Sequence, residues 1–244
     1  MITKMVCMAT HDYQWQLSPF TYLLHKYWGR DIEILYYADR LEGGVPEGVE
    51  YRQAPIMKEM DRWDWTKDFG VGFMSVLREL DDPVVMVCML DFWLVQPANL
   101  DMIDGMARYM EGHQNVIRTA LGLAPGAEPW SRCVETWEGM DVMTCDPKNN
   151  FHAGIMMNCG LFNREPTLAI YENTSSLQSE VMGWKVMQRH PELMSVWVRE
   201  PANMYEVAHV QIASARGTVF LRDVSAEDKQ MVKSLLPSHI KTED

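Results

Sequence analysis

A single aspartate closes the longest apolar stretch of the chain. Residues 83–90 read Pro-Val-Val-Met-Val-Cys-Met-Leu, a pattern typical of a strand buried on both faces, and Asp91 follows directly. A carboxylate at the mouth of a parallel sheet can bind Mg²⁺ or Mn²⁺, usually together with substrate phosphates. The alternative is that Asp91 only caps the following turn, and its position alone does not exclude this.

Polar residues follow two earlier strand-like segments as well. Residues 4–9 and 31–37 are predicted strands; Thr10, His11 and Asp12 follow the first, and Asp39 follows the second. In an open parallel sheet, ligands gather beyond the carboxyl ends of the strands. We therefore expect these side chains and Asp91 to lie along one edge of the sheet, around a ligand.

Aromatic residues and one glutamate add to this set. Tyr13, Trp65 and Trp93 lie near predicted strand ends, where a sugar ring or a nucleobase could stack on them. Glu180 stands near the start of a helix predicted at residues 179–190. Its carboxylate could act as a general base, or it could simply complement the helix dipole.

Several enzyme classes are excluded or disfavoured by missing motifs. The sequence has no GxGxxG or GxxxxGK[ST] loop, which argues against dinucleotide enzymes and P-loop ATPases. It also has no HExxH or GxSxG motif, and His113 and His152 are isolated, which favours surface or loop positions for them.

Charge and cysteine usage set further bounds. The 244 residues carry a formal net charge of −12, which argues against a long phosphate track on nucleic acid but not against a local basic groove. The five cysteines are odd in number and contain no CxxC pair, so we expect reduced thiols, with neither a disulfide framework nor a zinc site. With no signal peptide and no membrane span, the sequence predicts a soluble, cytoplasmic protein.

Strand and helix signals alternate through the first half of the chain. Helices are predicted at residues 18–27, from Ser18-Pro19 to Gly29, at 65–80, and after the cap residue Asn99; further strands are predicted at 50–54 and 115–119. This order predicts an α/β fold: a Rossmann-type sandwich with a mostly parallel central sheet.

The second half gives weaker signals. Residues 120–150 are expected to be mostly loop, strands are expected within 151–162, 193–198 and 207–212, and Ser225 caps a final helix that Pro237 stops. We expect one domain over residues 1–244. Its parts are a ligand-binding half (1–119), a less regular half (120–222) and a C-terminal helix with its tail (223–244).

Four segments taken together resemble a known family. They are Trp65-Thr66 through the strand ending in Leu90-Asp91-Phe92-Trp93-Leu94, then Gly160-Leu-Phe-Asn-Arg-Glu165, then Glu180, and finally Tyr205 through Arg216-Gly217. In this order they resemble small bacterial and phage glycosyltransferase-like proteins of GT-A type. Two positions depart from the family pattern: Leu90 stands where a second aspartate is often found, and Leu177 where a tryptophan is common.

The resemblance implies a GT-A-like fold and a nucleotide-sugar donor. Asp91 would bind a divalent cation, Mn²⁺ or Mg²⁺, and Glu180 would be the catalytic base. The expected donor-binding residues are Thr10, His11, Asp12, Asp39, Trp65 and Lys67. The expected acceptor-binding residues are Trp93, Asn163, Arg164 and Tyr205.

The expected function is sugar transfer from the nucleotide sugar to a hydroxyl acceptor, with inversion. The acceptor would be a glycan or a hydroxymethylated base in phage DNA. The alternative is a non-catalytic nucleotide- or glycan-binding domain that has lost the metal motif. A sugar-nucleotide-forming nucleotidyltransferase is a third interpretation, disfavoured because a glycine-rich basic loop is missing near the N-terminus.

Overall fold

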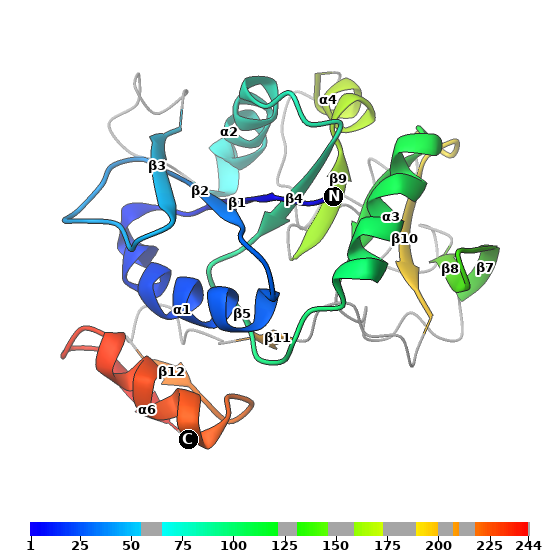
Figure 1. The fold of residues 1–244 in the computed structure, drawn as a ribbon. Coiled ribbons are helices and arrows are strands. Elements are labelled where there is room, and N and C mark those ends of the chain that lie inside the picture. Colours follow the sequence, from blue (N-terminus) through cyan, green and yellow to red (C-terminus); the bar gives the residue numbers. More distant parts are fainter. Residues whose placement is uncertain are drawn as a thin grey trace.

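The computed structural model describes residues 1–54, 65–121, 131–145, 159–172, 189–199, 207–209 and 218–243. Their largest element is a nine-stranded sheet with the order β3-β2-β1-β4-β9-β6-β10-β8-β7 (Figure 1). The expectation of an α/β protein is confirmed, and its sheet is mixed: four of the eight neighbouring strand pairs are parallel and four are antiparallel.

The first four strands form the parallel part of the sheet. They are β1 (Lys4–Met8), β2 (Glu33–Ala38), β3 (Val49–Gln53) and β4 (Val84–Cys88). β1 pairs with β2 on one side and with β4 on the other, so that Cys7 lies opposite both Tyr36 and Cys88. All four were predicted, and β1, β2 and β4 are short runs whose apolar residues signal burial.

The rest of the sheet mixes directions. β9 (Gly160–Asn163) lies antiparallel between β4 and β6 (Val116–Ala120), and β10 (Met194–Val198) runs parallel to β6. A hairpin of β7 (Ser131–Trp137) and β8 (Met140–Cys145) completes the far edge. The prediction that residues 120–150 are mostly loop is therefore wrong at 131–145, where the polar residues face solvent on an edge hairpin.

In the part of the chain that the structure describes, two helices pack on each face of the sheet. α1 (Leu17–Trp28) and α3 (Leu100–Gly112) pack on one face, and α2 (Trp65–Glu79) and α4 (Arg164–Glu172) on the other (Figure 1). The strands alternate accordingly, as in β1, where Met5 and Cys7 join the first core and Val6 and Met8 the second.

Local capping signals behave as expected. Gly29 ends α1 in the left-handed conformation, with φ 80°, and the Asn99 side chain accepts a hydrogen bond from the Met102 backbone N–H at 3.2 Å. The predicted loop after β1 is instead a 3₁₀ helix, His11–Gln16, that leads directly into α1. α1 consequently begins at Leu17, with Gln16 as its cap residue, so the prediction of Ser18 as the cap is wrong by two positions.

The C-terminal residues form a small unit beside α1. β12 (Thr218–Phe220) pairs in parallel with β13 (Lys241–Glu243), and α6 (Ala226–Leu235) joins them, capped by the predicted Ser225. A second small sheet pairs β5 (Phe92–Leu94) with β11 (Val207–His209). Figure 1 places α6 next to α1 and β5 beneath the large sheet.

The cysteine prediction needs a correction. Cys88 and Cys159 form a disulfide, whereas Cys7, Cys133 and Cys145 carry thiols. The spacing of 71 residues hid this pair, because only the antiparallel pairing of β4 with β9 brings the two residues opposite each other. Among the described residues, no helix has the length and apolar composition needed to span a bilayer.

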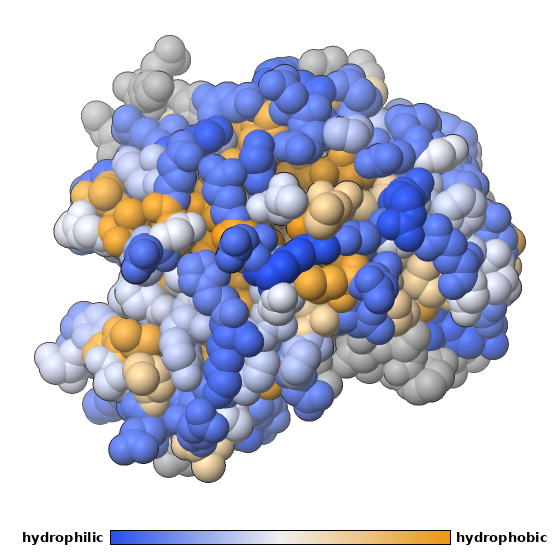
Figure 2. Space-filling view, viewed as in Figure 1, coloured by the Kyte–Doolittle hydropathy of each residue, from blue (hydrophilic) through white to orange (hydrophobic). Residues whose placement is uncertain are grey.

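The surface is mostly polar. On the face shown in Figure 2, apolar residues emerge only in separate patches between hydrophilic ones. In the described part of the chain, the large apolar side chains that are clearly exposed are those of Met1, Tyr13 and Met231.

Candidate functional site

The strand order reverses between β1 and β4. From β1 the chain builds outward through β2 and β3 on one side, then returns to place β4 on the other side of β1. In open α/β sheets, such a reversal leaves a crevice outside the carboxyl ends of the two strands, and ligands bind there. Thr10 to Asp12 follow β1, Asp91 follows β4, and Asp39 follows β2, so all were expected at this edge.

His11 and Asp39 meet at this edge. The Asp39 carboxylate accepts a hydrogen bond from the His11 backbone N–H at 2.6 Å and lies 2.6 Å from His11 Nδ1. Both side chains are more than four-fifths buried. A single carboxylate therefore fixes the main chain after β1 and the orientation of the imidazole ring.

Arg40 determines which ring nitrogen carries the proton. Its guanidinium lies 2.6 Å from His11 Nε2 and can only donate, so Nε2 accepts and Nδ1–H donates to Asp39. In this tautomer the nearby Asp12 carboxylate, 3.2 Å from Nε2, receives no hydrogen bond from the ring.

Hydrogen bonds hold the loop after β2 against the 3₁₀ helix that follows β1 and against the end of β3. Gln14 Nε2 donates to the Glu42 carbonyl at 2.9 Å, and Gln14 Oε1 accepts from the Glu42 N–H at 2.8 Å. Gln53 Nε2 donates to the Asp39 carbonyl at 3.2 Å. Sequence analysis missed Gln14, Arg40 and Gln53. The adjacency of Arg40 to Asp39 was the only local signal for any of them.

The net charge of Asp12, Asp39, Arg40 and Glu42 around His11 (the His11 cluster) favours some ligands over others. In the described part of the chain, the carboxylates of Asp12, Asp39 and Glu42 face a single guanidinium, that of Arg40, which forms an ion pair with Glu42 at 2.7 Å. An excess of negative charge disfavours phosphate at this point and favours groups that donate hydrogen bonds, such as base N–H and ribose or sugar hydroxyls.

The three aromatic candidates differ in availability. Tyr13 lies in the 3₁₀ helix two residues after His11 and is 38% exposed, so its ring can accept a stacked ligand. Trp93 is fully buried, and its indole N–H donates to the Leu90 carbonyl at 2.8 Å. A buried Trp93 side chain has no exposed surface on which an acceptor could bind, contrary to the expectation. The Trp65 side chain lies outside the described part.

Asp91 sits in a turn after β4. The Phe92 N–H donates to the Met89 carbonyl at 3.1 Å and closes the turn, while Leu90 is buried in the core. Among the described residues, no group of three His, Cys, Asp or Glu side chains can hold a metal ion. With the described residues alone, Asp91 fits the kind of Mg²⁺ or Mn²⁺ site in which the substrate supplies further oxygen ligands.

The acceptor residues are occupied elsewhere. Asn163 is buried and donates from Nδ2 to the Met110 carbonyl at 2.9 Å. Arg164 donates from Nε to the Leu77 carbonyl at 2.8 Å and pairs with Glu165. The structure thus uses both to join α4 and β9 to the helices on either face, a role that their motif did not indicate. Four predicted site residues lie outside the described side chains: Trp65, Lys67, Glu180 and Tyr205.

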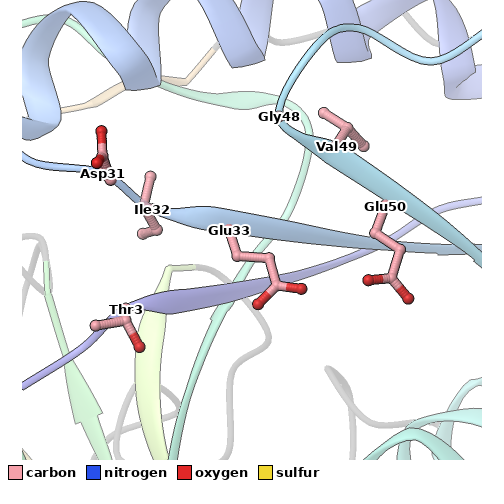
Figure 3. A pocket seen from close by; sticks show the side chains of 7 residues that line it. All are labelled: Thr3, Asp31, Ile32, Glu33, Gly48, Val49 and Glu50. Atoms are coloured by element: carbon pink, nitrogen blue, oxygen red, sulfur yellow. The ribbon is translucent and has the colours of Figure 1, made fainter.

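A groove lies at the opposite edge of the sheet. It has a volume of about 560 Å³ and is lined by Thr3, Asp31, Ile32, Glu33, Gly48, Val49 and Glu50. Figure 3 shows Glu33 and Glu50 directed into it from neighbouring strands. Glu50 is bound to Arg52 at 2.7 Å, and this hydrogen bond lowers the pKa of Glu50. We place the site at the carboxyl edge, because volume alone does not provide the convergent polar contacts of the His11 cluster.

Neither the protein-family models nor the curated proteins searched contain a match to this chain.

Proposed function

We propose that the chain binds a nucleotide sugar at the carboxyl edge of β1, β2 and β4 and transfers the sugar to a hydroxyl acceptor. The single observation that carries this proposal is the His11–Asp39 pair, held by two 2.6 Å contacts beside the reversal of strand order. Such a position suits a ligand with a nucleoside at one end and a reactive group at the other.

The nucleoside end would lie over β1 and β2. Tyr13 would stack on the base, and the carboxylates of Asp12 and Asp39 would accept from base or ribose donors, with Thr10 beside them. The acidic excess keeps the phosphates away from this cluster, which directs the diphosphate towards β4 and Asp91. A divalent cation bound there would neutralise charge on the departing diphosphate.

The transfer needs a base on the acceptor side. The base takes the proton of the acceptor hydroxyl, the oxygen attacks the anomeric carbon, and the bond from that carbon to the diphosphate oxygen breaks. One displacement of this kind inverts the anomeric configuration and releases a nucleoside diphosphate. Glu180 is our candidate for the base, on the resemblance of its segment to the GT-A-type proteins. A glycan or a hydroxymethylated base in phage DNA remains the expected acceptor, and the latter would have to be flipped out of its helix.

A non-catalytic nucleotide- or glycan-binding domain is the second candidate. It is favoured by Leu90, which is buried directly before Asp91 and supplies no metal ligand. Both candidates bind the nucleotide sugar, but only the enzyme releases free nucleoside diphosphate. Release of the diphosphate therefore distinguishes them.

A thermal-shift screen tests the donor site. The panel contains nucleoside diphosphates and nucleotide sugars, with and without Mn²⁺. A ligand at 100 times its Kd should stabilise the fold by about 2.7 kcal/mol, which raises Tm by roughly 5–10 °C in a chain of this size. The screen is repeated with Asp39→Asn, and with Glu33→Gln as the matched control at the opposite edge.

We expect wild type and Glu33→Gln to shift equally and Asp39→Asn to lose most of the shift. No shift of the wild type with any ligand would overturn the proposed donor class. Equal shifts in all three proteins would place the site elsewhere. Diphosphate release is then measured on the ligand found, with and without candidate acceptors, in wild type and Glu180→Gln. Near-normal turnover in Glu180→Gln would remove Glu180 as the base.

A further inference from the structure

Three cysteines lie in a row across the centre of the sheet. Cys7 on β1 is the register partner of Cys88 on β4, and Cys88 stands opposite Cys159, which directly precedes β9. All three are buried in the core on the α1 and α3 face. Cys88 and Cys159, with Cα atoms 4.2 Å apart, form the disulfide. The row lies at the carboxyl end of β4, three residues before Asp91.

We propose that the Cys88–Cys159 bond is a reversible redox link that controls how firmly the turn bearing Asp91 is held. In the oxidised state the bond fixes Cys88, the last residue of β4, to the neighbouring strand. The turn of residues 89–92 starts from this fixed point. Reduction removes the link from the base of the turn.

The fold accommodates both states. β4 and β9 are already paired from Val84 with Asn163 to Val87 with Gly160, so the backbone ladder holds the strands together without the disulfide. The turn also offers acceptors to a reduced Cys88, whose Sγ lies 3.6 Å from the Met89 carbonyl and 3.8 Å from that of Phe92. A thiol would donate weak hydrogen bonds there, so the chemical state of Cys88 acts directly on the turn.

The exchange is a balanced two-electron step. Because both cysteines are buried, exchange requires the core above them to open locally. A dithiol reductant then attacks one sulfur of the bond and forms a mixed disulfide, and its second thiol releases the protein. The products are two protein thiols and one oxidised reductant. In the reverse direction, glutathione disulfide accepts two electrons and leaves as two glutathione thiols.

Cys7 is the register partner of Cys88 and is the nearby thiol that could compete in this exchange. The identity of the linked peptide pair in the test below decides whether it does. Cys133 is exposed on β7 at the far edge of the sheet, so it provides the matched control.

Thiol counting tests the bond without any variant. The protein is equilibrated with glutathione disulfide or with excess dithiothreitol, then denatured and alkylated, and its mass is measured by mass spectrometry. We expect three alkylated cysteines after oxidation and five after reduction, with a linked peptide pair containing Cys88 and Cys159. Five alkylated cysteines in both conditions, or a linked pair that includes Cys133, would overturn the proposal.

Hydrogen exchange tests the coupling to the turn. On reduction we expect amides of residues 88–94 to exchange at least several-fold faster, while those of β2 stay unchanged. The same acceleration should occur in Cys88→Ser/Cys159→Ser without reductant, and Cys133→Ser should respond as wild type does. Unchanged exchange at 88–94 in a protein whose thiol count rises from three to five would refute the coupling.

These readouts need no nucleotide, so they stand apart from the proposed sugar transfer. If the thermal-shift screen identifies a donor, its Kd is compared in the two redox states as an additional measurement.

Discussion

Asp39 binds His11 at two points, accepting from its backbone N–H and contacting its ring Nδ1, each at 2.6 Å. The residues are 28 positions apart and follow neighbouring parallel strands. The pair therefore joins the ends of β1 and β2, and Arg40 completes it by donating to Nε2. No other pair among the described residues brings this many of the expected donor-site groups together.

Asp39→Asn should weaken both the fold and the site. An amide in place of the carboxylate turns an N–H₂ group or a weaker acceptor towards His11, and hydrogen bonds to charged groups contribute about 1.5–3 kcal/mol each. We expect the free energy of unfolding to fall by about 1–3 kcal/mol in urea denaturation. Asp31→Asn, exposed at the opposite edge, is the control and should be neutral. A neutral Asp39→Asn would contradict the anchoring role.

Tyr13 and Trp93 should give opposite results. Tyr13→Ala removes an exposed ring, so stability should hardly change, while the Kd of a bound nucleotide should rise about tenfold or more through lost stacking. Trp93→Phe removes a buried indole and its hydrogen bond to Leu90. It should cost about 1–3 kcal/mol of stability and leave the Kd within about twofold. Urea denaturation measures the stability and titration calorimetry the Kd. A stability loss for Tyr13→Ala together with a raised Kd for Trp93→Phe would contradict the assignment of Tyr13 to ligand stacking and Trp93 to the core.

Asp228 should make stability fall in acid. Burial alone would raise its pKa, but hydrogen bonds from Lys26, Tyr27, Ser225 and Tyr22 outweigh burial and lower it to about 2, from an ordinary value of 3.8. Because the folded pKa is the lower one, the carboxylate stabilises the fold fully above about pH 5. About 2 kcal/mol of that stability is lost as pH falls through 4 towards 2.

Measuring the free energy of unfolding from pH 7 to pH 2 checks whether stability falls in acid as expected. Asp228→Asn should be less stable than wild type at pH 7, and the difference should shrink steadily below pH 4. Glu227→Gln is the control, since that neighbouring carboxylate is largely exposed and should matter little at any pH. A difference for Asp228→Asn that stays constant down to pH 2 would show that the carboxylate is not the responsible group.

Gly160→Ala should strain the centre of the sheet. A Cβ at this position would lie 3.0 Å from the Thr119 carbonyl oxygen and 3.2 Å from Arg118 Nε, and the backbone atom cannot move aside easily. We expect a loss of about 1–3 kcal/mol, as for overpacking in a core. Gly112→Ala, which meets nothing within 4 Å, should be neutral or slightly stabilising. Equal urea midpoints for the two variants would exclude the predicted strain.

Elements with local signals could be predicted from the amino-acid sequence alone. The apolar run before Asp91 predicted β4, and Gly29, Asn99 and Ser225 correctly predicted helix ends. These succeed because burial on both faces and capping each need only a few neighbouring residues. The expectation that His11 and Asp39 share an edge also came from the strand ends alone, since parallel strands place their carboxyl ends together.

Contacts between residues far apart in the sequence could not be predicted and are visible only in the folded protein. The insertion of β9 between β4 and β6 brings Cys159 to Cys88, and the docking of α6 brings Asp228 to Tyr22 and Lys26, more than 200 positions away. The same packing buries Trp93, whose place after Asp91 had suggested a ligand contact. Such pairings depend on strand order and register, which are fixed by the summed burial of the whole chain. The local sequence around each residue therefore carries no signal of its distant partner.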